Sequence, residues 1–145
     1  MIGTEVGPGE RAPVIVAYGD ELVRRVLAEH VRDCGYAVFE AAGSDEALAM
    51  IADPACRIDA LLCDVAIAGE RSGFGLTIEA KDLHPELRVM LTGSLAAAAS
   101  AAVELCARAG QGGDPDGRAL ADRIKRALEE RDAALTTQFH EGTTR

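Results

Sequence analysis

The chain has 145 residues, which is the length of one domain with enough apolar residues to bury a core. A formal net charge of −9 disfavours direct contact with nucleic acid or with an anionic membrane surface, since both contacts require a basic patch. No segment approaches the roughly 20 apolar residues of a membrane span, and Met1–Arg11 lacks the apolar run of a signal peptide, so we expect a soluble, cytoplasmic protein.

The first half of the chain alternates between strand and helix patterns. Val14–Ala17 is a short apolar run that predicts a buried strand, and the period of the apolar residues in Glu21–Cys34 predicts a helix. Tyr36–Ala42 resembles a second strand. A second helix begins at Ser44, because a hydroxyl cap and an acidic first turn suit exposed amides, and it runs to about Asp53.

The middle of the chain continues this alternation. Asp59–Asp64 predicts a third strand, which is apolar until it ends on a carboxylate. The glycine-bearing loop Gly69–Gly73 leads into a helix that ends at Leu83, and Arg88–Leu91 predicts a fourth strand that ends at Thr92.

The last third is ambiguous at one place. Leu95–Ala109 is rich in alanine and predicts a helix, but Val103–Arg108 also alternates well enough for a fifth strand, and the pattern does not separate the two. A final amphipathic helix is predicted from Leu120 to Leu135.

Strands that alternate with helices predict an α/β fold, a doubly wound parallel sheet of the flavodoxin-like plan with helices on both faces. We expect five strands in the order 2-1-3-4-5, in one domain at residues 13–134, between a lead at 1–12 and a polar tail at 135–145. Ligand sites in such sheets lie beyond the carboxyl ends of the strands. Three polar residues, Asp20, Asp64 and Thr92, follow predicted strands and are expected to gather there.

Three blocks in this order resemble the response-regulator receiver family of two-component signal transduction: GDELVRRVLAEHVRDCGYAVFEAAGSDEAL, DALLCDVAIAGERSGFGL and PELRVMLTGS. The resemblance implies phosphorylation of Asp64 and a switch hydroxyl at Thr92. It also implies Mg²⁺ held by acidic residues after the first strand, by Asp64 and by the backbone carbonyl of Ala66. The implied partners are a histidine kinase or phosphotransfer protein, which donates the phosphoryl group in a phosphorelay, and a downstream protein that the sequence does not identify.

The sequence departs from the family pattern around this pocket. Tyr18 and Gly19 stand where the family has its acidic pair, and Asp20 comes one place late. The family's lysine after the fifth strand is replaced by Arg108 or Gln111, depending on the gap chosen. We therefore expect weak Mg²⁺ binding that involves Asp64, Asp20 and the Ala66 carbonyl.

Other interpretations compete with this one. Asp20 is expected to be the N-cap of the first helix rather than a metal ligand, and Tyr18 to fill the pocket. A pseudo-receiver that binds its partner without phosphorylation fits the same residues. An aspartyl-nucleophile phosphatase is disfavoured because Ala66 stands where such an enzyme needs a second carboxylate, so we expect no enzyme.

The cysteines and histidines carry no motif. Cys34, Cys56, Cys63 and Cys106 form no CxxC pair and no metal-ligand spacing, so we interpret them as reduced core residues. The histidines show no partner spacing either. Neither residue type predicts a site.

Overall fold

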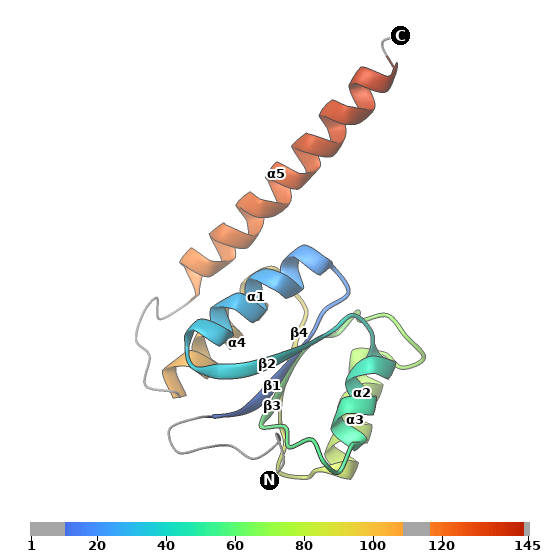
Figure 1. Ribbon diagram of the computed structural model, residues 1–145, viewed down its shortest axis with the longest axis vertical. Coiled ribbons are helices and arrows are strands. Elements are labelled where there is room, and N and C mark those ends of the chain that lie inside the picture. The colour runs from blue at the N-terminus through green and yellow to red at the C-terminus, as the bar shows by residue number, and fades with distance from the viewer. Residues whose placement is uncertain (1–10, 109–116, 144–145) are drawn as a thin grey trace.

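The computed structural model describes residues 11–108 and 117–143, and within these ranges it has four strands and five helices. The strands are parallel and lie in the order β2-β1-β3-β4, which confirms the predicted doubly wound α/β class (Figure 1). In chain order the elements are β1 (Arg11–Ala17), α1 (Glu21–Asp33), β2 (Tyr36–Ala41), α2 (Ser44–Ala52), β3 (Ala60–Asp64), α3 (Gly73–Leu83), β4 (Arg88–Thr92), α4 (Leu95–Arg108) and α5 (Arg118–Thr143).

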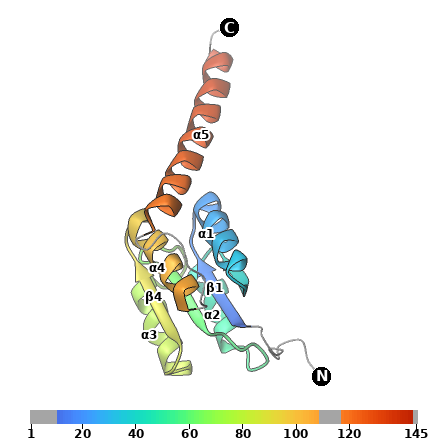
Figure 2. The same cartoon turned by 90° about the vertical axis from the view of Figure 1, so that its left-hand side faces the viewer.

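The helices divide between the two faces of the sheet. α1, α4 and the first turns of α5 pack on one face, and α2 and α3 cover the other (Figures 1 and 2). Strand β3 lies inside the sheet, so its apolar residues Ala60–Cys63 are fully buried between these two layers. The carboxylate of Asp64 is the first side chain of β3 to emerge from this core.

The alanine-rich segment resolves the ambiguity at Val103–Arg108. These residues form the second half of α4, so the alternative of a strand there is wrong. Its small residues allow α4 to lie close to its neighbours: Ala98, Ala99, Ala102 and Leu105 are buried in the same core cluster as the inner face of α1. The apparent alternation therefore reflects a helix that is apolar over much of its circumference.

The position of α4 explains why the described part of the sheet stops at β4. The β2-α2-β3 and β3-α3-β4 connections place α2 and α3 on one face. A right-handed connection to a further strand beside β4 would place α4 on that same face, but α4 lies with α1 on the opposite one. α4 therefore lies over the sheet on the α1 face and does not lead by a right-handed connection to a strand beside β4. Residues 109–116, including Gln111, lie outside the described residues.

The last helix begins against the core and then projects away from the sheet (Figures 1 and 2). Leu120 and Ile124 are buried between α1 and α4. Gly117 has a φ of 75°, and a Cβ there would lie 2.9 Å from the backbone of Ala99, so only glycine suits this close start of α5. The helical backbone continues to Thr143, through residues 135–143 that the sequence predicts to be a polar tail.

The cysteine interpretation needs one correction. Cys34 and Cys106 form a disulfide between the C-terminal ends of α1 and α4, with their Cα atoms 5.4 Å apart. Cys56 and Cys63 are free thiols, as predicted for all four. Within residues 11–108 and 117–143 no helix combines the length and the apolar character that a membrane crossing requires.

Candidate functional site: the Asp64 pocket

Asp64 lies at the carboxyl end of β3, beside Thr92 at the end of β4. The amide of Val65 donates to the Thr92 carbonyl at 2.9 Å, which joins the two strand ends directly. The Asp64 carboxylate is partly buried, and its Oδ1 accepts a hydrogen bond from the Ala66 amide at 3.1 Å. The structure thus brings together the strand-end residues that the sequence predicts to meet.

Close packing holds the loop after Asp64 in place. A Cβ on Gly73, the first residue of α3, would lie 2.6 Å from the carbonyl oxygen of Asp64 and 2.8 Å from the Cα of Val65. Gly69 has a φ of 125°, and its backbone lies against the buried side chain of Ser44. The position of Asp64 therefore depends on glycines in the loop and at the start of the following helix.

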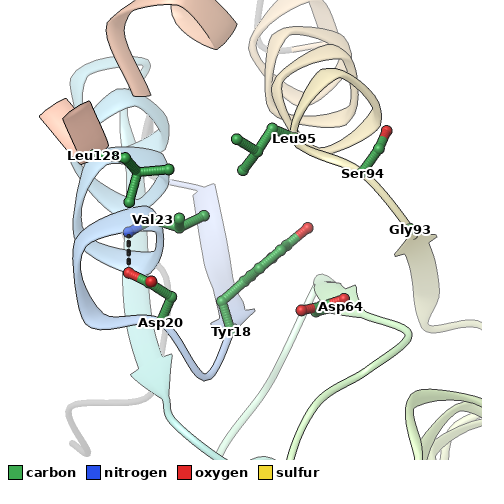
Figure 3. Close-up of a pocket in the computed structure, with 8 residues that line it drawn as sticks. All are labelled: Tyr18, Asp20, Val23, Asp64, Gly93, Ser94, Leu95 and Leu128. Carbon is green, nitrogen blue, oxygen red and sulfur yellow. Dashed lines mark hydrogen bonds between the residues drawn. The ribbon is translucent and has the colours of Figure 1, made fainter. Parts of the chain in front are cut away.

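Tyr18 occupies the floor of the site. Its side chain is buried, and its hydroxyl shares a hydrogen bond with Oγ1 of Thr92 (Figure 3 shows the ring extending into the pocket past Asp64). Burial raises the pKa of Tyr18 well above its usual value, and the nearby Asp64 charge raises it further. Tyr18 is therefore a neutral, pocket-filling group, as predicted, and it engages the hydroxyl that the family resemblance assigns to the switch.

Asp20 is the N-cap of α1, which confirms the preferred interpretation of this residue. Its Oδ1 accepts from the amides of Leu22 at 2.9 Å and Val23 at 3.2 Å, and it pairs with Arg131 of α5 at 3.2 Å. Burial alone would raise the pKa of Asp20, but the hydrogen bonds from the Val23 amide and Arg131 outweigh it and lower the pKa. In Figure 3 the carboxylate points to the start of α1 rather than to Asp64.

A cavity of about 330 Å³ opens between these groups. The start of α4 forms one wall, where Oγ of Ser94 accepts from the Ala97 amide at 3.1 Å and so caps the helix. α5 contributes Leu128 to the opposite wall. The lining residues are Tyr18, Asp20, Val23, Asp64, Gly93, Ser94, Leu95 and Leu128 (Figure 3).

The structure separates Arg108 from this cavity. Arg108 is the last residue of α4, whose first residues line the cavity, and a helix of 14 residues is about 20 Å long. Arg108 therefore lies at the far end of the sheet and cannot substitute for the family's lysine at Asp64. The other candidate for that position, Gln111, is outside the described residues.

Sequence reasoning missed the contributions of α5 and of Ser94. The sequence pattern places Leu128 only on an amphipathic helix. It contains no signal for Arg131, because the ion pair with Asp20 joins residues 111 positions apart. Ser94 precedes a helix and could have been found as a hydroxyl N-cap. The packing of α5 beside α1 is what adds these groups to the pocket.

The donor groups around Asp64 do not form the acidic metal site that the family resemblance implies. Gly19 has no side chain, Tyr18 is a buried neutral hydroxyl, and Oδ1 of Asp20 is used by the α1 cap and Arg131. Mg²⁺ requires a near-octahedral shell of oxygens and is usually held by one or two carboxylates together with water. Among the described residues lining the cavity, Asp64 alone presents a carboxylate that is not engaged in a helix cap.

Comparison with solved structures identifies the class. The receiver domain of the hybrid histidine kinase CckA is 32% identical, with 55% of this chain and 73% of that domain covered and a TM-score of 0.51. A CheY-like receiver domain protein from Methanospirillum hungatei JF-1 is 21% identical, with 85% and 98% covered and a TM-score of 0.53. A response regulator from Burkholderia pseudomallei, solved with a phosphorylated aspartic acid, a calcium ion and citrate, is 20% identical, with 83% and 73% covered and a TM-score of 0.52.

The chain belongs to the response-regulator receiver family, which confirms the resemblance drawn from its three sequence blocks. No protein-family model matches the chain, and no curated protein matches it. The family was therefore found from the order of its elements and from the fold, while its pocket residues deviate from the usual pattern.

Proposed function

We propose that this chain is a receiver-type signalling module that docks to a partner protein in a single conformation, without requiring phosphorylation. The observation that carries this proposal is the Tyr18–Thr92 hydrogen bond, because it engages the switch hydroxyl from within the core. Thr92 is buried, and its Oγ1 also lies 3.5 Å from the Cys63 carbonyl oxygen. A hydroxyl held in this way is not free to move toward a group on Asp64.

The charge around Asp64 supports the same conclusion. Attack by a carboxylate on a phosphorus centre brings negative groups together, so cations must offset their repulsion. Arg108 lies at the other end of α4, and the nearby Arg131 is already paired with Asp20. The described part of the pocket therefore supplies little of the positive charge that phosphoryl transfer needs.

Phosphorylation of Asp64 is the second candidate, and a specific observation favours it. The carboxylate is partly exposed at a cavity of about 330 Å³, where the amides at the start of α4 form part of the wall. Helix N-termini favour anions. In this case a histidine kinase or phosphotransfer protein would be the donor. Mg²⁺ would bind weakly at Asp64 and the Ala66 carbonyl, because Asp20, the other predicted ligand, is engaged by the α1 cap and Arg131.

Intact mass after incubation with acetyl phosphate and Mg²⁺ separates the two candidates. We expect slow labelling that stays well below one phosphoryl group per chain and disappears in Asp64→Asn. Rapid, stoichiometric labelling of the wild-type protein, lost in Asp64→Asn, would contradict the proposal and establish the second candidate.

The partner is expected to be a protein. A formal charge of −9 opposes binding to duplex DNA or to an anionic membrane, because the chain has no net positive charge to neutralise phosphates and displace their counterions. A DNA mobility-shift assay at physiological salt should show no complex. Sequence-specific retardation of a DNA fragment would contradict this assignment.

A further inference from the structure

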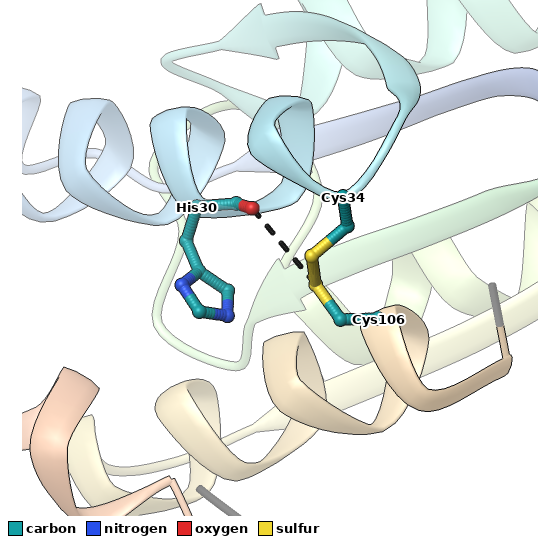
Figure 4. A group of neighbouring side chains, drawn as sticks. All are labelled: His30, Cys34 and Cys106. Carbon is teal, nitrogen blue, oxygen red and sulfur yellow. Dashed lines mark hydrogen bonds between the residues drawn. A yellow bond between two sulfur atoms is a disulfide. The ribbon is translucent and has the colours of Figure 1, made fainter. Parts of the chain in front are cut away.

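A cysteine and histidine cluster lies at the end of the molecule opposite Asp64. His30 lies in the last turn of α1, and Cys34, four positions later, is the C-cap of that helix. Both side chains face the last turn of α4, where Cys106 lies (Figure 4). One potential ligand atom from each residue lies within 4.8 Å of the others. None of these three side chains is among the described residues that line the Asp64 pocket.

We propose that this cluster is a redox-gated zinc site: the reduced protein binds one Zn²⁺ through His30, Cys34 and Cys106, and formation of the Cys34–Cys106 disulfide releases it. The structure shows the oxidised arrangement, with the two sulfur atoms bonded. In the thiol state the Cys106 S–H can donate to the His30 carbonyl oxygen, which is 3.8 Å from Sγ (dashed in Figure 4).

The ligand types and their spacing fit zinc. Thiolate and imidazole are the ligands that Zn²⁺ prefers, and a pair at i and i+4 on one helix face is a recurring zinc-binding arrangement. Bond lengths of about 2.3 Å to sulfur and 2.0 Å to nitrogen place tetrahedral ligand atoms about 3.5–3.8 Å apart. The observed limit of 4.8 Å requires only a small side-chain adjustment once the disulfide is opened.

The surroundings suit a site with three protein ligands and one water. Both cysteines are buried, whereas His30 is partly exposed and leaves a path for the ion. Two thiolates supply the negative charge that a divalent cation requires.

The gating step is a two-electron oxidation, for which we name a peroxide as the oxidant. The two zinc-bound thiolates lose two electrons, an S–S bond forms and Zn²⁺ leaves. Hydrogen peroxide takes up these electrons and two protons, and its O–O bond breaks to give two water molecules. A dithiol reductant reverses the step by thiol–disulfide exchange, after which Zn²⁺ binds again.

Zinc titration against a chromophoric chelator tests the site. Fully reduced protein should bind one Zn²⁺ per chain, and disulfide-bonded protein should bind none at this affinity. Cys34→Ser or Cys106→Ser should abolish binding. His30→Ala removes a direct ligand, so it should weaken binding by more than the roughly tenfold loss that follows removal of an outer-shell partner. The matched controls, Cys56→Ser and His84→Ala, should bind as wild type does. Reduced wild-type protein that takes up no Zn²⁺, or that keeps it in either cysteine variant, would overturn the proposal.

Cobalt and peroxide provide readouts that do not depend on folded variants. Co²⁺ added to the reduced wild-type protein should give a thiolate-to-metal charge-transfer band, whereas binding to surface carboxylates would not. Peroxide added to the zinc-loaded protein should release one Zn²⁺ for every two thiols lost, and peptide mapping should recover the Cys34–Cys106 disulfide. Absence of the band, or zinc release without this disulfide, would overturn the proposal.

Discussion

The two ends of α4 lie in different chemical environments. At its first residues, Ser94 and Leu95 line the Asp64 pocket, where the carboxylates and the cation of the family pattern are replaced or engaged elsewhere. At its last turn, Cys106 is bonded to Cys34 in a cluster that takes no part in the Asp64 pocket. The end at the Asp64 pocket keeps the fold of a receiver site but has different side chains. The other end adds a redox-active cysteine pair to the contact between α1 and α4.

The largest expected effect is at the disulfide end. The bond closes a loop across 72 positions, and a cross-link of this span stabilises a folded chain by about 2–4 kcal/mol, chiefly by restricting the unfolded state. In a metal chelator, reduction should lower the urea midpoint of the wild-type protein. The Cys34→Ala/Cys106→Ala double variant should not respond to the reductant. Equal urea midpoints for oxidised and reduced wild type would show that the Cys34–Cys106 disulfide does not stabilise the fold.

A smaller effect is expected for tight packing at the pocket end. Gly73→Ala places a methyl group against the backbone of Asp64 and Val65, and overpacking of this kind costs about 1–3 kcal/mol. Gly75→Ala is the matched control on the same helix, because its Cβ would have ordinary contacts of 3.5 Å or more. Urea unfolding of the two variants should differ clearly. Equal stability would mean that the loop after Asp64 adapts easily.

Two tyrosine hydroxyls allow a direct comparison of the two ends of α4. The hydroxyl of Tyr18 bonds Thr92 at the pocket, and that of Tyr36 donates to the Leu105 carbonyl at 3.0 Å near the disulfide. Removing either buried hydrogen bond should cost about 0.5–1.5 kcal/mol. Tyr18→Phe should in addition speed labelling of Asp64 by acetyl phosphate, because it frees Thr92, whereas Tyr36→Phe should not. Equal labelling of the two variants would contradict a restraining role for Tyr18.

The smallest effect concerns the ion pair between Asp20 and Arg131. Asp20→Asn keeps an N-cap residue but loses the charge, so at neutral pH it should cost only about 0.2–1 kcal/mol. Because the pKa of Asp20 is lowered in the folded state, this stability is present above the pKa of the unfolded chain, about 4. It should be lost as the pH falls through the lower folded pKa. Urea unfolding of wild type and Asp20→Asn measures this difference. If the free energies of unfolding differ by the same amount at pH 2 as at neutral pH, the charge of Asp20 does not cause the difference.

Local patterns predicted most of the fold. The strand that ends at Asp64 and the N-cap at Asp20 are determined by residues close to them in the chain. A short stretch of sequence is therefore enough to predict both. Val103–Arg108 was ambiguous because an alanine-rich helix packed against several neighbours carries no clean period. Its placement on the α1 face depends on tertiary packing, which no short window records.

The candidate site was predicted in part for the same reason. Asp64 and Thr92 each end a strand, and parallel topology brings such ends together. The Asp20–Arg131 pair and the Cys34–Cys106 disulfide join distant positions through the packing of α4 and α5 on α1. Without a spacing motif, these contacts could be found only from the folded structure.

Labelling of Tyr18→Asp/Gly19→Asp by acetyl phosphate and Mg²⁺, compared with wild type by intact mass, shows whether the missing acidic pair limits phosphorylation of Asp64. Gly19 can accept a side chain, since a Cβ there would meet only the Ala42 carbonyl oxygen at 3.8 Å. If the missing acidic pair is the limit, the double variant should bind Mg²⁺ more strongly and label faster and more completely, and Asp64→Asn should abolish the labelling. Wild-type protein that binds Mg²⁺ and labels as readily as the double variant would contradict this expectation, because the present residues would then already form a working phosphoacceptor pocket.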